Sequence, residues 1–390
     1  MQSNLNRCVA VRGRPMTDPD AQFPTATAII RGGYDQGLHT GAQVYVSRGG
    51  VALADFAVGH VRPETPMAPD TLMLWMSSCK PVGAVAIAQL CERGLIAFDT
   101  PVCGVIPEFA AGGKDTITVK HILTHTGGFR WAELGAAETS RDEIISRICA
   151  MPLETDWIPG QRAGYHIETS WFILGELVRR LDGRSYDRYV REAIFEPLGM
   201  NDSWIGMPPE RYRGYGGRIG VMYNTFQGQC APAGFDSETY CVSCRPGGGG
   251  RGPIRELGRF YEMLLEGGHY GGKQIVRSET VNTLTTRHRV GMMDETFRHR
   301  MDWGLGFILN SNRYGPQTVP YGYGLHASPR AFGHSGAQSS VGFADPEHGL
   351  VVAAVFNGMP GEPKHNRRMR QFLSALYVDL GLAPAPPTVP

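Results

Sequence analysis

The sequence predicts an α+β fold in which strands from both termini form one antiparallel sheet, flanked by helices, with a mainly helical region inserted between them. Near the N-terminus, residues 42–57 contain two strand-like runs around a glycine-rich turn, a pattern typical of a hairpin. Residues 340–356 repeat this pattern near the C-terminus. Apolar side chains recur at helical spacing in residues 168–181 and 254–265. A further stripe over residues 369–380 predicts a terminal helix that covers the sheet.

The composition favours a globular protein with a small-molecule partner. The chain has 390 residues, of which 42% are hydrophobic, enough for one large or two medium domains with buried cores. Its 38 Lys and Arg balance 37 Asp and Glu, so it lacks the excess of cations that binds nucleic acid or anionic membranes. We therefore expect neither of these partners. The oligomeric state stays open.

Several segments bear on location and organisation. The sequence contains no uninterrupted run of about 18 apolar residues, so no transmembrane helix is predicted. The first residues do not resemble a signal peptide, and we therefore expect a cytoplasmic protein. The eight cysteines are then expected to be reduced. Residues 210–250 and 285–330 are predicted to be loops beside a site, and Gly247–Gly250 a flexible turn, because no Lys-Ser/Thr of a phosphate loop follows.

The clearest chemical motif begins at Ser77. Residues 77–93 predict a short buried helix, and Pro81 fits only in its first turn because proline has no N–H to donate. This places Ser77 at the helix N-terminus, where unpaired N–H groups favour developing negative charge. Lys80, one of only five lysines, shares a face with Ser77 and in apolar surroundings could accept its proton. The alternative is that Ser77 only caps the helix and Lys80 is an exposed charge.

Two further motifs give this pair a context. Tyr165 lies just before the helix predicted over residues 168–181, and His334-Ser335-Gly336 lies on a predicted strand. With Ser77-Ser78-Cys79-Lys80, this ordered set resembles the serine β-lactamase and penicillin-binding-protein superfamily. It is most similar to the class C-like branch, with the family VIII carboxylesterases and related transesterases. The resemblance covers roughly residues 25–380 and implies a β-lactamase/transpeptidase-like fold.

The resemblance also implies a division of the chain and a set of catalytic roles. The expected division is an N-terminal extension (1–24), a catalytic unit (25–382, with an α/β part at about 25–95 and 300–382 and a helical insert at about 96–299) and a Pro-rich tail (383–390). Ser77 would attack a carbonyl and form an acyl-enzyme. Lys80 and Tyr165 would share the proton transfers, and which of them is the base stays open. The backbone N–H groups of Ser77 and Ala337 would form the oxyanion hole. No cofactor or metal is expected.

Other residues are expected to contact the substrate. By the same resemblance, His334, Ser335 and Gly336 would line the site, and Gly336 would let the substrate approach the strand closely. Trp75, Trp131 and Trp157 flank the motifs and are candidates for an apolar acyl pocket, with an aromatic core as the alternative. Cys79 lies within the motif but is expected to pack away from Ser77.

Two departures from the family pattern bear on the substrate. The usual Tyr-x-Asn is Tyr165-His166-Ile167 here, so the amide that holds the acylamide group of β-lactams is missing. His334 replaces a permanent cation and is mostly neutral at pH 7. Both changes favour the ester or thioester of an uncharged acyl group, so the function we expect is that of a carboxylesterase.

Four alternatives stay open. The first is an acyltransferase or transesterase, which passes the same acyl group to an alcohol or amine. The second is a β-lactamase or D-amino-acid peptidase, and the third a non-catalytic binding protein with this fold. The last is a zinc hydrolase using His121, His125 and a cysteine, although the resemblance makes the segment with the two histidines a structural turn.

Overall fold

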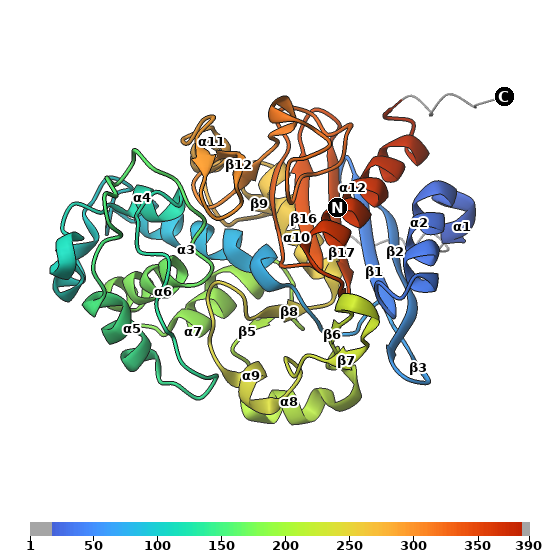
Figure 1. Ribbon diagram of the computed structural model, residues 1–390, viewed down its shortest axis with the longest axis horizontal. Coiled ribbons are helices and arrows are strands. Elements are labelled where there is room, and N and C mark those ends of the chain that lie inside the picture. Colours follow the sequence, from blue (N-terminus) through green and yellow to red (C-terminus); the bar gives the residue numbers. More distant parts are fainter. Residues whose placement is uncertain (1–17, 384–390) are drawn as a thin grey trace, which may run out of the picture.

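An antiparallel sheet of eight strands organises the structure, a computed structural model that describes residues 18–383 (Figure 1). The strand order is β13-β14-β15-β16-β17-β1-β2-β3. These strands are β1 (Gly41–Arg48), β2 (Val51–Arg62), β3 (Thr65–Pro66), β13 (Asp302–Trp303), β14 (Ile308–Leu309), β15 (Phe332–Ser335), β16 (Ser340–Asp345) and β17 (Leu350–Phe356). Strand β1 pairs with β17, which joins the two ends of the chain. The predicted sheet from both termini is confirmed, and with it the α+β class.

Helices cover both faces of this sheet. The helices are α1 (Pro19–Gln22), α2 (Pro24–Asp35), α3 (Lys80–Glu92), α4 (Val119–Leu123), α5 (Arg141–Ala150), α6 (Thr169–Asp182), α7 (Tyr186–Val190), α8 (Pro209–Tyr215), α9 (Glu238–Val242), α10 (Ile254–Leu265), α11 (Ser278–Thr285) and α12 (Glu362–Asp379). Helices α2 and α12 pack together on one face, and α10 packs on the other (Figure 1). Helices α3 to α7 gather on one side of the sheet, at the left of Figure 1.

The alternation of side chains along the central strands explains these two layers. Successive residues of a strand point to opposite faces. Val44 and Val352 accordingly belong to the apolar cluster that contains Phe372 of α12. Their neighbours Tyr45 and Ala353 belong instead to the cluster that includes α10 and the inserted helices. Both faces of the central strands are therefore buried.

Short paired strands replace part of the predicted loop regions. In or at the edge of those regions, these strands are β6 (Tyr223–Asn224), β7 (Ala231–Pro232), β8 (Gly250–Gly252), β11 (Met293–Asp294) and β12 (His299–Arg300). The other short strands, β4 (Met73–Leu74), β5 (Trp204–Ile205), β9 (His269–Tyr270), β10 (Lys273–Gln274) and β18 (Gly358–Met359), lie outside them. Residues 210–250 also contain α9, and residues 285–330 contain edge strands of the main sheet. The prediction that these regions are only loops was wrong, because elements of two to seven residues carry too little periodicity to be read from sequence.

Most of the predicted N-terminal extension, residues 1–24, and nearly all of the predicted tail, residues 383–390, lie outside the described residues. The division into an α/β part and an insert at the stated boundaries stays a prediction. Within residues 18–383, no helix is long and apolar enough to cross a membrane.

Helix α10 approaches the sheet closely at Gly258. A Cβ atom at this position would lie 2.2 Å from Cδ1 of Tyr45 on β1. The Tyr45 ring cannot easily move away, because its hydroxyl donates a 2.6 Å hydrogen bond to Glu262 one turn further along α10. Glycine at this position therefore permits contact between helix and sheet.

We predict that Gly258→Ala destabilises the protein by about 1–3 kcal/mol, because overpacking outweighs the roughly 1 kcal/mol by which alanine favours a helix. Gly214→Ala in α8 is the matched control, since a Cβ atom there would have no neighbour within 4 Å. Urea unfolding followed by far-ultraviolet circular dichroism measures both variants. A Gly258→Ala protein as stable as the Gly214→Ala protein would contradict this account.

Candidate active site

Ser77 lies in a tight turn that leads into α3. Met76 has φ +49°, a left-handed conformation that is rare for a residue with a side chain and is often found at functional sites. Residues Met76–Cys79 form a 3₁₀ turn, and α3 begins at Lys80. Pro81 has no N–H for the carbonyl of Ser77, which instead accepts a bond from the N–H of Lys80. The prediction that Ser77 begins the α-helix itself is thus corrected: Ser77 lies in the 3₁₀ turn that precedes the helix.

The surroundings of Ser77 leave one opening to solvent. Among residues 71–88, every residue except Ser77 is buried. Cys79 is completely buried, its thiol contacts the carbonyl of Pro246, and burial raises its pKa to about 11. The packing role expected for Cys79 fits this placement. The turn therefore presents one hydroxyl group at the surface of an otherwise closed segment.

The Lys80 amine lies beside the Ser77 hydroxyl in the interior. Its Nζ is 3.0 Å from Ser77 Oγ, 2.7 Å from the carbonyl oxygen of Ile167 and 2.5 Å from that of Gly247. Lys80 is fully buried, and the loss of hydration lowers its pKa to about 8. The two carbonyls can only accept, so a neutral amine keeps both bonds and still has a lone pair for the serine proton. The alternative of an exposed Lys80 was wrong.

Tyr165 completes this group from the segment before α6. Its ring lies 5.3 Å from Lys80 Nζ. Burial raises the pKa of Tyr165 well above its usual value, and the nearby Ser77 hydroxyl offsets only part of this effect. Tyr165 is therefore protonated at neutral pH. Residues that lie far apart in sequence thus place three proton-carrying groups together.

The strand with the third motif is connected directly to the Ser77 turn. The hydroxyl of Ser78 donates to the carbonyl of His334 at 3.1 Å, and the hydroxyl of Ser340 donates to the carbonyl of Trp75 at 2.5 Å. The two hydroxyls are themselves 2.9 Å apart. Gly336 lies close to the same turn, since a Cβ atom at this position would be 2.4 Å from the carbonyl oxygen of Trp75.

His334 and the residues after it flank the site. The ring Nδ1 of His334 lies 2.8 Å from the carbonyl of Ser335, so Nδ1 carries the proton. Burial lowers the pKa of His334 to about 3, with a smaller contribution from the charge of Lys80, and the imidazole is neutral. Ser335 is buried and donates its hydroxyl to the carbonyl of Tyr321, whereas Ala337 is exposed in the turn between β15 and β16. The proposed oxyanion role of the Ser77 and Ala337 N–H groups stays a prediction.

Comparison with known proteins identifies the family. Residues 26–376 match the beta-lactamase family. The chain belongs to this family. It is 25% identical over 319 residues to the esterase/beta-lactamase LipL of Mycobacterium tuberculosis (strain ATCC 25618 / H37Rv), a match that covers 75% of this chain and 70% of LipL.

Solved structures of similar proteins agree in fold. A family VIII carboxylesterase is 27% identical, with a TM-score of 0.75 over 94% of this chain and 99% of that protein. A penicillin-binding-protein homologue from Caulobacter crescentus is 29% identical, with a TM-score of 0.76 over 92% of this chain and 97% of that protein. The β-lactamase/transpeptidase-like fold and the family resemblance are confirmed. The family is one of serine hydrolases and includes esterases, so membership alone does not define the substrate.

The three candidate tryptophans of this beta-lactamase family member lie in different environments. Trp75 is fully buried and donates to the carbonyl of Gly252, so it belongs to the aromatic core rather than to a pocket surface. Trp157 is 3% exposed and lies between the guanidinium groups of Arg130 and Arg162. Trp131 is 58% exposed and is the one of the three that offers an open apolar surface.

The two histidines considered as zinc ligands have separate structural environments. His121 accepts the N–H of Thr118 in a capping box at the start of α4. His125 is buried and accepts the N–H of His166 at 3.0 Å. Within residues 18–383, no group of three or more His, Cys, Asp or Glu is arranged to hold a metal ion. The zinc alternative therefore has no support from this geometry.

Sequence reasoning missed the partners that fix Lys80 and Tyr165. The turn Gly247–Gly250, predicted to be flexible, is largely buried and supplies a carbonyl to Lys80, while Gly250 accepts the N–H of Trp75 at 2.7 Å. Asp294 accepts the N–H of Tyr165 at 3.1 Å. In the sequence, the run of four glycines at Gly247–Gly250 was the one visible signal for the contact with Lys80. No signal pointed to the contact between Asp294 and Tyr165.

We predict that Gly336→Ala slows labelling of Ser77 by a fluorophosphonate by about 100-fold or more, because the new methyl group would displace β15 from the Ser77 turn. Gly104→Ala is the control, since a Cβ atom there would have no neighbour within 4 Å. Labelling is followed by intact mass spectrometry, with circular dichroism as the check on folding. A folded Gly336→Ala protein that reacts at the wild-type rate would show that this close approach is dispensable.

Proposed function

We propose that this protein is a serine carboxylesterase that forms an acyl-enzyme on Ser77. The observation that carries the proposal is the contact between a partly exposed Ser77 hydroxyl and a buried Lys80 amine with a pKa of about 8. A lysine with an unperturbed pKa would be almost wholly charged at neutral pH and could not accept a proton. Burial makes the neutral form accessible near physiological pH.

Acylation follows from this arrangement. Neutral Lys80 donates two N–H bonds to the carbonyls of Ile167 and Gly247 and accepts the Ser77 proton on its lone pair. Ser77 Oγ then bonds to the ester carbonyl carbon, and the carbonyl electron pair moves to the oxygen. When the tetrahedral intermediate collapses, the bond to the leaving alkoxide breaks, and the alkoxide takes a proton from the Lys80 ammonium, either directly or through the Tyr165 hydroxyl, which gives up one proton as it receives another. A water molecule then cleaves the acyl-enzyme by the same proton transfers in reverse.

The raised pKa of Tyr165 supports Lys80 as the base in this scheme. A tyrosinate would be needed for Tyr165 to accept the serine proton directly, and burial makes that form costly at neutral pH. Protonated Tyr165 is instead suited to donate a hydrogen bond or a proton. The proposal therefore takes Lys80 as the base and Tyr165 as the hydrogen-bond donor.

The surroundings of the site support a neutral acyl substrate. Ile167 presents an apolar side chain, 49% exposed, where related enzymes with Tyr-x-Asn have an amide. His334 is neutral and cannot grip a substrate carboxylate as a cation would. Similarity to LipL and to a family VIII carboxylesterase, both named for esterase activity, supports the same class of reaction.

We predict that a short-chain nitrophenyl ester gives a burst of nitrophenol and an acyl adduct on Ser77, and that Ser77→Ala abolishes both. Intact mass spectrometry and peptide mapping after a short incubation measure the adduct. Ser78→Ala is the neighbouring control: it should still form the adduct on Ser77.

Several outcomes separate the alternatives. An adduct that transfers to an added alcohol faster than to water would identify an acyltransferase. Nitrocefin turnover approaching ester turnover would favour a β-lactamase despite Ile167. A wild-type protein that remains unmodified by a panel of activated esters would overturn the proposal and leave a binding protein with this fold.

We predict that the burst rate constant rises about tenfold per pH unit below pH 8 and levels off above it, because only neutral Lys80 accepts the proton. Tyr165 stays protonated across this range, since its pKa is raised. Stopped-flow measurements between about pH 6 and 10 give the profile. Lys80→Arg, which stays charged, should show no such rise. A wild-type midpoint near 6.5 would point to a histidine as the base.

A further inference from the structure

The backbone of Tyr165 is held by a loop far away in the sequence. Asp294 Oδ1 accepts the N–H of Tyr165 at 3.1 Å, and Thr296 Oγ1 donates to the carbonyl of Tyr165 at 3.0 Å. The N–H of Glu295 donates to the carbonyl of Ala163 at 2.9 Å. Both polar backbone groups of Tyr165 therefore bond to side chains of one loop, residues 293–297.

Asp294 is itself fixed in the interior. Its Oδ1 also accepts the N–H groups of Thr296 and Phe297, each at 3.0 Å. Its Oδ2 accepts Nη2 of Arg289 at 2.9 Å, and both side chains are almost fully buried. Arg289 in turn donates Nη1 to the carbonyl of Thr124 at 3.0 Å. A buried carboxylate with all these bonds has one favourable orientation, because losing any bond would leave a buried polar group unpaired.

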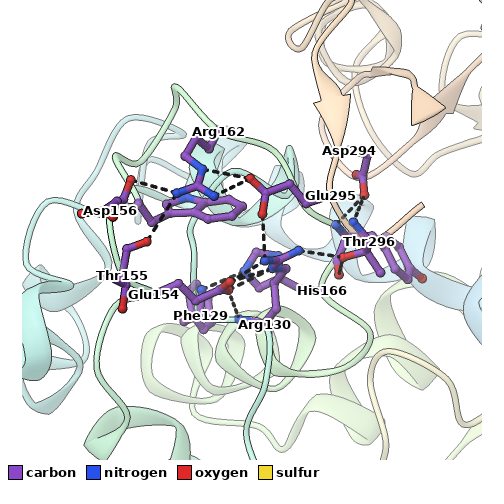
Figure 2. A network of polar contacts seen from close by, with 12 residues as sticks. Phe129, Arg130, Glu154, Thr155, Asp156, Arg162, His166, Asp294, Glu295 and Thr296 are labelled. Carbon is purple, nitrogen blue, oxygen red and sulfur yellow. Dashed lines mark hydrogen bonds and ion pairs between the residues drawn. The ribbon is translucent and has the colours of Figure 1, made fainter. Parts of the chain in front are cut away.

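A network of charged groups lies beside this contact (Figure 2). Arg130 contacts Glu154 at 2.5 Å and Glu295 at 3.1 Å, and it donates to Thr296 Oγ1 at 3.1 Å. Arg162 contacts Glu295 at 2.7 Å from the segment that leads to Tyr165. These ion pairs are partly exposed and individually weak, but together they connect the loop to the segments on both sides of Tyr165.

Tyr165 needs such external support. It lies in an irregular segment before α6, so no helix or strand ladder determines its backbone conformation. The Phe297 ring, 4.8 Å from the Tyr165 ring, adds a packing contact from the same loop. A shift of about 1 Å in a reacting group can cost about two orders of magnitude in rate.

We propose that Asp294 is a positioning residue of the active site: its buried carboxylate, together with Thr296, holds the Tyr165 backbone so that the hydroxyl reaches Ser77. The inference rests on the proposed function, because it concerns proton transfer during acylation of Ser77. Asp294 acts through Tyr165 and is not itself expected to contact the substrate.

The test compares Asp294→Asn with Asp302→Asn, a matched control. Asp302 is also fully buried, also pairs with arginines (Arg287 and Arg313), and accepts the N–H of Gly291, but it has no contact with Tyr165. We predict that Asp294→Asn lowers the burst rate constant by about 10- to 100-fold, and that Asp302→Asn changes it by less than about threefold. Equal effects of the two variants would overturn the proposal.

A double-mutant cycle separates positioning from general destabilisation. Tyr165→Phe alone should slow the burst by about 100-fold or more, because the proton-carrying hydroxyl is lost. In the Tyr165→Phe background, Asp294→Asn should have less than about a threefold further effect, since no hydroxyl remains to be placed. If the full Asp294→Asn factor persists in this background, Asp294 does not act through the Tyr165 hydroxyl and the proposal fails.

A milder variant covers the case in which Asp294→Asn does not fold. Thr296→Val removes the bond to the Tyr165 carbonyl at a partly exposed position. We expect Thr296→Val to slow the burst three- to tenfold, and to cause no further slowing in the Tyr165→Phe background. An unchanged burst in the Thr296→Val protein would count against the proposal. Failure of the proposed function looks different, because wild-type protein would then show no burst at all.

Discussion

The burial of one amine determines much of the chemistry of this protein. Lys80 is surrounded by the Ser77 hydroxyl and by two carbonyls that reach it from segments 87 and 167 residues away. In water an ammonium group would gain far more from hydration than three neutral acceptors supply, so the folded protein holds Lys80 at a cost. That cost appears as the lowered pKa, and it makes the lysine useful as a base.

Packing of helix α3 and hydrogen bonds of the Ser77 turn keep this amine in place. Helix α3 is apolar on nearly all sides and packs against α6, α7 and β15. The Ser77 turn is bonded to β15 and β16 through Ser78 and Ser340, and to the glycine-rich turn through Trp75. The site therefore lies where the sheet meets helix α3, and a change in the contact between them would alter the distances at Ser77.

The sequence was informative where a feature is local and uninformative where it depends on contacts between distant segments. Ser77 and Lys80 are one turn apart, so helical spacing and an apolar context identified the pair. Tyr165 and His334 could be found only by resemblance to a family, since nothing nearby marks them. Asp294 was missed because an aspartate in a loop carries no sign that a tyrosine 129 residues away will bond to it.

Burial was a second limit on what the sequence could predict. Trp75 and Trp131 both flank recognised motifs, and an aromatic residue at such a position is compatible with a core or with a pocket. The structure places one inside and the other at the surface. Gly247–Gly250 was misread for a similar reason, because glycines permit both a mobile loop and a close approach of backbone to a buried group. The strands and long helices, whose apolar periodicity extends over several residues, were predicted well.

The electrostatics of the site give the proposed preference for uncharged acyl groups a simple physical basis. His334 is neutral, Tyr165 is protonated, and Ile167 brings an apolar side chain, so Lys80 is the one group among these four that changes charge near neutral pH. A substrate carboxylate near this group would favour the charged form of Lys80, raise its pKa and so reduce its capacity as a base. A neutral acyl group has no such effect. Under the proposed function, the same burial that prepares Lys80 for proton transfer would thus favour uncharged substrates, even without a residue dedicated to excluding charged ones.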